Sequence, residues 1–131
     1  MTTDYHIRIL HLEDNVANAR LVEILLEESG LFTFELAQHQ FIGEALKAFD
    51  PDQYDLILSD LNLPDSNGME TIQTWRKAAP SLPLVISSGY EDTEMVIKAV
   101  EAGAQDYLIS GTFNDGQGLA LRLLLAFLRK Q

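Results

Sequence analysis

The feature that most constrains this chain is a regular alternation between two patterns of apolar residues. Short, nearly continuous apolar runs are typical of strands buried in a parallel sheet, and longer runs with apolar residues at helical spacing are typical of amphipathic helices. The expected strands are 7–12, 31–36, 54–59, 84–88 and 106–109, and the expected helices are 15–29, 41–49, 68–79, 92–102 and 116–130. Five strand–helix units in series predict an α/β fold.

The connections between these runs fit the same fold. Gly30 and Gly103 follow expected helices, where glycine is favoured as the ending residue. Right-handed crossovers then place helices on both faces of a doubly wound, five-stranded parallel sheet, and the flavodoxin-like order 2-1-3-4-5 makes strands 7–12 and 54–59 neighbours. A Rossmann order is disfavoured because Asn15-Val16-Ala17-Asn18, rather than Gly-x-Gly-x-x-Gly, follows the first strand.

Length and composition limit the classes of protein. A chain of 131 residues predicts one domain, 1–131, and a net charge of −11 disfavours direct contact with nucleic acid, so protein partners are expected. No apolar run reaches the roughly 20 residues of a membrane span, and no basic segment precedes an apolar one at the start, which predicts a cytoplasmic location without membrane contact. The absence of cysteine excludes thiol chemistry and leaves oxygen ligands for a metal, which favours Mg²⁺.

Three carboxylates are expected to meet at one edge of the sheet. Glu13 and Asp14 follow the first strand, and Asp60 follows the third. Open α/β sheets bind ligands at the carboxyl ends of their strands, where the strand order reverses. These residues therefore predict a cation site that contains a potential nucleophile, Asp60. Taken singly, Asp60 also fits a turn-forming residue, and the acidic pair also fits a helix cap.

Five motifs occur in an order and spacing that are specific only in combination. They are an acidic pair after the first strand, an Asp after the third strand, the Pro and Gly that follow this Asp, a Ser at the end of the fourth strand and a Tyr in the fifth: Glu13, Asp14, Asp60, Pro64, Gly68, Ser88 and Tyr107. Together they resemble the receiver domain of response regulators over essentially the whole chain. The resemblance implies two-component signal transduction or a phosphorelay, in which Asp60 becomes an aspartyl phosphate.

The resemblance also implies the chemistry around Asp60. The phosphoryl group comes from a sensor histidine kinase, a phosphotransfer protein or a small phosphodonor, and the domain is a phosphoacceptor that can catalyse its own phosphorylation and dephosphorylation, not a turnover enzyme. Mg²⁺ offsets the charge of the incoming group. Asp14 and Asp60 hold this ion directly, Glu13 holds it through water, and Asn62 supplies its backbone carbonyl.

Two further positions match the family, and one does not. Ser88 is expected to donate from its hydroxyl to the phosphoryl group, with Ser87 as the alternative, and Tyr107 is expected to be the aromatic ring that moves inward as a switch. Both residues also fit ordinary strand positions. Where the family carries Lys and then Pro, this chain has Ser110 and Gly111, so an uncharged donor replaces an ammonium group.

The last expected helix is unusually apolar. From Leu119 to Leu128 only Arg122 is polar, which predicts a surface for a partner or a second copy of the chain, with deep packing as the alternative. Asn114 or Asp115 is expected to cap this helix. The resemblance implies signalling through the face formed by 92–102, 106–109 and 116–130, a possible homodimer through that face, and a downstream output domain or protein partner, as in a receiver excised from a longer regulator.

Two other functions remain open. Without the Lys, the chain is also consistent with a pseudo-receiver, an interaction module that works without phosphorylation. A phosphatase of the haloacid dehalogenase type also uses an Asp nucleophile with Mg²⁺, but it needs a second Asp two residues later to act as the acid and base, and this chain has Asn62 there.

Overall fold

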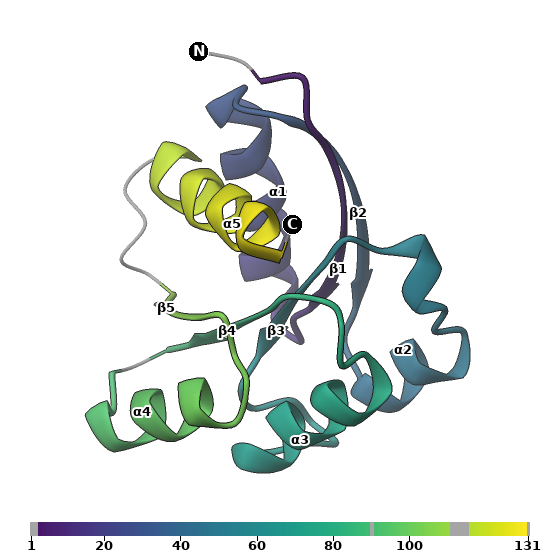
Figure 1. Cartoon of the computed structure of the whole chain (residues 1–131), viewed down its shortest axis with the longest axis vertical. Helices are drawn as coiled ribbons and strands as arrows, with labels where there is room; N and C mark the ends of the chain where they lie inside the picture. Colours follow the sequence, from purple (N-terminus) through teal and green to yellow (C-terminus); the bar gives the residue numbers. More distant parts are fainter. Residues whose placement is uncertain (1–2, 90, 111–115, 131) are drawn as a thin grey trace.

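A computed structural model describes residues 3–89, 91–110 and 116–130 and has three layers (Figure 1). The middle layer is a sheet of five parallel strands in the order β2-β1-β3-β4-β5. Its strands are β1 (His6–Leu12), β2 (Thr33–His39), β3 (Leu56–Asp60), β4 (Leu84–Ser88) and β5 (Asp106–Ile109). Both the fold class and the strand order predicted from the sequence are confirmed.

Helices cover both faces of this sheet (Figure 1). One face carries α1 (Val16–Ser29) and α5 (Gly116–Lys130), and the other carries α2 (Ile42–Lys47), α3 (Met69–Ala78) and α4 (Thr93–Glu101), with a short 3₁₀ turn at Pro51–Gln53. Successive strand residues point to opposite faces, so each strand feeds both cores. In β1, Ile7 and Ile9 pack with α1 and α5, whereas Leu10 and Leu12 pack with α2 and α3.

The second strand differs most from its prediction. It begins at Thr33 and ends at His39, whereas the apolar pattern placed it at 31–36. Leu31 and Phe32 are buried in the core on the α1 and α5 face, but they precede the strand, so burial alone misplaced its start. Gly30 ends α1 as predicted, with a left-handed φ of 57°.

The final helix is packed more deeply than the sequence suggested. Leu119, Leu123 and Leu124 are buried on the α1 side of the molecule, and of its apolar residues Leu121 and Leu125 are the most exposed, at 48% and 36%. Its apolar character therefore mainly serves the core, in line with the alternative of deep packing, and Leu121 and Leu125 are what it leaves for the expected partner surface. The two residues expected to cap it, 114 and 115, lie outside the described residues. In the described part of the chain, the helices are too short or too polar for a membrane span.

Candidate functional site

The three predicted carboxylates do lie together, at the carboxyl ends of β1 and β3. These strands are direct neighbours, and Leu12 pairs with Ser59. The next residue of each chain segment, Glu13 and Asp60, therefore lies at the same height along the sheet. One carboxylate oxygen from each of Glu13, Asp14 and Asp60 lies within 4.8 Å of the other two. Hard cations such as Mg²⁺ are bound by oxygens in this kind of arrangement.

The start of α1 fixes how the acidic pair is presented. The Asn15 side chain accepts a hydrogen bond from the Asn18 backbone N–H at 3.0 Å, so Asn15 is the helix cap and Asp14 is not. Glu13 turns inward, is 7% exposed, and accepts from the Asn15 backbone N–H at 3.1 Å. Asp14 is left exposed beside it, and its side chain can therefore contact a ligand in the hollow.

Asp60 has a direct hydroxyl partner on the neighbouring strand. Ser87 pairs with Asp60 in the sheet register, and its Oγ donates to Asp60 Oδ1 at 2.7 Å. The sequence analysis predicted that Ser88 donates to the phosphoryl group, with Ser87 as the alternative, and it predicted no hydroxyl partner for the Asp60 carboxyl group itself. The contact follows from the strand register, because parallel strands pair residue by residue and residue 87 is the partner of residue 60.

The surroundings of Asp60 disfavour its charge. Burial raises the pKa of Asp60 to about 8, and the neighbouring Glu13 and Asp14 act in the same direction, whereas the hydrogen bond from Ser87 opposes them. A carboxyl group with this pKa is mostly protonated at neutral pH unless a cation is present to favour the ionised form.

An open hollow of about 280 Å³ gives access to these carboxylates. Asp60 lines it together with Asn18 from the first turn of α1 and with Ser88, Gly89 and Ser110 from the ends of β4 and β5. Asn62 also lines it, but its Oδ1 accepts from the Gly68 backbone N–H at 3.0 Å. The Asn62 side chain is therefore engaged in holding the turn before α3.

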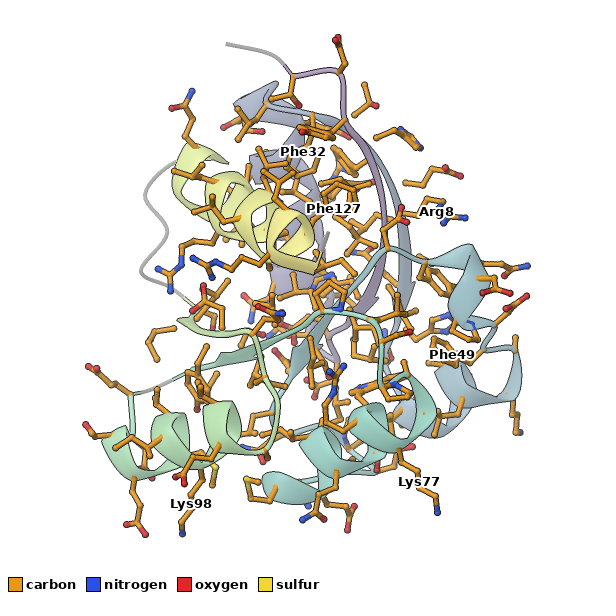
Figure 2. The ribbon with its side chains drawn as sticks, in the orientation of Figure 1. Arg8, Phe32, Phe49, Lys77, Lys98 and Phe127 are labelled. Carbon is orange, nitrogen blue, oxygen red and sulfur yellow. The ribbon has the colours of Figure 1, made fainter. Side chains whose placement is uncertain are left out.

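Ser110 occupies the end of β5, next to the same hollow. Its Oγ donates to the Ser88 carbonyl at 3.0 Å, and its backbone N–H bonds to the same carbonyl at 2.8 Å. Among the described residues that line the hollow there is no Lys or Arg. Lys77 and Lys98 point from α3 and α4 away from the sheet (Figure 2).

Tyr107 lies on the other side of β4 and β5, against α4. Its ring is 8% exposed and belongs to the core shared by α3 and α4. It lines a second hollow, of about 120 Å³, together with Ser88, Asp92 and Met95. Ser88 thus lines both the acidic hollow and the hollow beside Tyr107.

Comparisons with known proteins agree with this geometry. The family model of the response regulator receiver domain matches residues 9–112. Among curated relatives, the cell cycle transcriptional regulator CtrA of Caulobacter vibrioides is 38% identical over 104 residues, which make up 77% of this chain and 42% of the relative. The cell cycle response regulator CtrA of Brucella ovis is 35% identical over 103 residues, with the same coverage. The match thus spans less than half the length of these relatives.

Solved structures show the same fold. NtrX from Brucella abortus aligns with a TM-score of 0.81 at 25% identity, covering 96% of this chain and 28% of that one. The beryllofluoride-activated NtrC4 receiver domain dimer aligns with a TM-score of 0.80 at 21% identity, covering 95% and 98%. A response regulator receiver domain protein from Clostridium thermocellum aligns with a TM-score of 0.76 at 24% identity, covering 95% and 96%.

Proposed function

Because this chain belongs to the receiver-domain family of two-component response regulators, we propose that Asp60 accepts a phosphoryl group in a Mg²⁺-dependent reaction. The observation that carries the proposal is the convergence of Glu13, Asp14 and Asp60 around one point, with the Ser87 hydroxyl bonded to Asp60. Receiver domains are signalling modules, so the product is a phosphorylated protein that acts on a partner, not a released metabolite.

The donor set fits the ion. Three carboxylates supply the oxygen ligands that Mg²⁺ requires, and we assign Asp14 and Asp60 as direct ligands and Glu13 as a ligand through water. The Asn62 side chain is engaged by Gly68, which leaves the Asn62 backbone carbonyl as the group available for the ion. When bound, Mg²⁺ supplies positive charge that offsets the repulsion between these carboxylates and an incoming phosphoryl group.

The proposed step makes Asp60 the nucleophile. The Asp60 carboxyl group first loses its proton to solvent, because only the ionised form can attack. One of its oxygens then forms a bond to phosphorus, while the P–N bond of a phosphohistidine, or the P–O bond to acetate in acetyl phosphate, breaks. The leaving imidazole or acetate keeps the electron pair of that bond. Ser87 holds the other carboxylate oxygen during the attack.

The proposed signal passes from the hollow to the face formed by α4, β5 and α5. The Ser88 hydroxyl donates to a phosphoryl oxygen, and Tyr107 adjusts in the hollow that it shares with Ser88. Ile97 and Val100 are exposed on α4, as are Leu121 and Leu125 on α5, so this face offers apolar side chains to a partner or a second copy. A sensor kinase or phosphotransfer protein is the proposed donor, and an output domain or protein is the proposed target.

The intact mass of the chain tests the phosphoryl-transfer proposal. The native chain and the Asp60→Asn variant are incubated with acetyl phosphate in the presence of Mg²⁺ or EDTA. The proposal expects one added phosphoryl group only for the native chain with Mg²⁺. Glu70→Gln, an exposed acidic position on α3, is a matched control and should behave as the native chain does. An adduct on Asp60→Asn would contradict the proposal.

A second candidate function is an interaction module that does not use phosphorylation. It is favoured by one observation, the uncharged Ser110 at the end of β5 beside a carboxyl group whose pKa burial raises to about 8. The Ser110→Lys variant separates the two functions. If the native chain takes up no phosphoryl group but Ser110→Lys does, the missing ammonium has made this chain an interaction module.

A further inference from the structure

The strand β2 forms one edge of the sheet, and no other strand of the described part of the chain lies on its outer side (Figure 1). It is seven residues long and contains neither Pro nor Lys, two residues that commonly protect an edge from pairing. The strand at the other edge, β5, has only four residues. An unpaired edge as long as β2 is a template on which another extended chain can pair.

The hydrogen bonds to β1 show which backbone groups of β2 point outward. The Thr33 N–H donates to the Tyr5 carbonyl at 3.1 Å, and the His39 carbonyl accepts from the Glu13 N–H at 3.0 Å. Successive residues of a strand direct their N–H and C=O groups to opposite sides, so the odd-numbered residues of β2 bond towards β1. The three residues whose N–H and C=O groups point away from the sheet are Phe34, Leu36 and Gln38.

An open groove of about 460 Å³ lies between this edge and α1. Its apolar lining residues are Leu26 of α1 and Phe32, Phe34 and Leu36 at β2, and its carboxylates are Glu23 and Glu27 of α1. Thr33 completes the lining, and its hydroxyl oxygen lies 2.7 Å from His6 Nδ1. Phe34 and Leu36 are only partly buried, so an added strand can cover the apolar surface that they leave exposed.

The charged side chains that line this groove are both acidic. Glu27 is exposed and forms no ion pair with a described Lys, Arg or His, whereas Glu23 pairs with Arg20. Arg20 and His39 line a separate hollow nearer the end of β2, so the acidic wall lies beside the first half of the strand. Together with the net charge of −11, this wall attracts a basic segment and repels a second copy of the chain.

The spacing of the two carboxylates indicates which basic segment fits. Glu23 and Glu27 are four residues apart on a helix, which is a rise of about 6 Å. Two residues of a strand rise about 6.6 Å, so basic residues at alternate positions of an added strand match this spacing. The aliphatic part of each basic side chain can then lie on Phe34 or Leu36 while its charged end reaches a carboxylate.

We propose that the edge of β2 binds an extended segment of a partner protein that carries Lys or Arg at two alternate positions and that adds to the sheet as a sixth strand. The outward backbone groups supply the main-chain hydrogen bonds, and the acidic groove supplies the selectivity. This binding does not depend on phosphoryl transfer, because the groove does not include Asp60. The Asp60→Asn variant should therefore bind the segment as the native chain does.

Hydrogen exchange measured by NMR tests the proposal, with the peptide acetyl-Thr-Val-Lys-Val-Lys-Val-Thr-amide as the probe. We expect saturable binding with a Kd below about 1 mM. The bound peptide should slow exchange of the amide protons of Phe34, Leu36 and Gln38. The amide protons of Glu35 and Ala37 point towards β1 and should keep their exchange rates. Absence of binding, or binding without this alternating protection, would overturn the proposal.

A second peptide controls for charge. Acetyl-Thr-Val-Lys-Lys-Val-Val-Thr-amide has the same composition, but its two Lys residues lie on opposite faces of a strand. It should bind about fivefold more weakly than the first peptide. Equal binding of the two peptides would show attraction by net charge alone and would overturn the proposal.

Two variants locate the groove. Glu27→Gln should weaken binding of the first peptide about threefold. Glu28→Gln, at the next exposed position of α1 and outside the groove, is the matched control and should leave binding unchanged. Equal losses in the two variants would contradict the proposed groove. Protection of the Phe34, Leu36 and Gln38 amides in the free chain that is lost on dilution would place a second copy at this edge, and would also overturn the proposal.

Discussion

Ser87 Oγ lies 2.7 Å from Asp60 Oδ1 and donates a hydrogen bond to it across the β3–β4 register, in which the two residues are direct partners. This bond favours the charged form of a carboxyl group that its other neighbours push towards the neutral form. The pairing therefore adjusts the protonation of the proposed nucleophile. Ser88, the next residue, lies on the opposite side of the strand, towards Tyr107.

We predict that Ser87→Ala raises the pKa of Asp60 further, because it removes the hydrogen bond that lowers it. Phosphorylation by acetyl phosphate should then require a higher pH than in the native chain. The pH profile of adduct formation measures this. Ser88→Ala is the matched control, since it removes a hydroxyl from the same hollow without removing the bond to Asp60, and its profile should keep the native midpoint.

Asp60 should make stability fall as pH rises. Its pKa in the folded chain is about 8, above the ordinary value of 3.8. Between these two pH values the folded chain therefore binds more protons than the unfolded chain. The free energy of unfolding then decreases as pH rises through this window. Without divalent cations, Asp60→Asn should remove this slope and be more stable than the native chain at pH 8, by on the order of a few kcal/mol. Urea unfolding at pH 5 and pH 8 in EDTA measures the effect. A native slope retained in the variant would show that another group causes it.

His11 should make the stability of the fold decrease as pH falls, which is opposite to the effect of Asp60. Burial lowers its pKa to about 4, so between about 6.5 and 4 the unfolded chain binds more protons and stability falls as pH falls. His11→Gln should lessen this acid destabilisation by up to about 3 kcal/mol at pH 4. His6→Gln serves as the control because His6 is exposed. Equal acid sensitivity in the native chain and in His11→Gln would refute the assignment.

Gly116 should tolerate no side chain. It begins α5 where that helix meets α1, and a Cβ there would lie 2.0 Å from the Leu25 carbonyl oxygen. Gly116→Ala should therefore destabilise the fold by about 3 kcal/mol, through separation of the two helices. Gly118→Ala, at an exposed position of the same helix, should instead be neutral or stabilising by up to about 1 kcal/mol. Thermal unfolding of both variants tests the contrast.

Much of the fold can be predicted from the sequence because the apolar patterns of strands and helices identify the elements and their order. Apolar runs and their spacing gave the parallel sheet, its order and the convergence of Glu13 with Asp60. The apolar pattern failed where a buried residue does not belong to a strand. Leu31 and Phe32 are such residues, because they lie in the core but precede β2. It also misjudged α5, because a helix against both a sheet and another helix buries more than a single stripe.

The site was predicted less completely than the fold. The residue types and their order identified the acidic cluster, but the choice between Ser87 and Ser88 depends on register, which only the paired strands define. A cavity lined by Leu25, Leu108 and Ser110 depends on how closely α1 and α5 pack together. No local pattern in the sequence encodes the separation of these two helices. The roles of Asp14, Asn62 and Tyr107 stay predictions.

The most direct test of phosphoryl transfer to Asp60 is to locate the modified residue. The native chain is incubated with acetyl phosphate and Mg²⁺, treated with borohydride, which reduces an aspartyl phosphate to homoserine, and analysed by peptide mass spectrometry. Our account predicts homoserine at position 60 and unmodified aspartate at position 14, with Ser110→Lys giving the same site. Homoserine at another carboxylate position would contradict this account. The absence of homoserine in the native chain would also contradict it, provided that a phosphorylated control receiver is reduced under the same conditions.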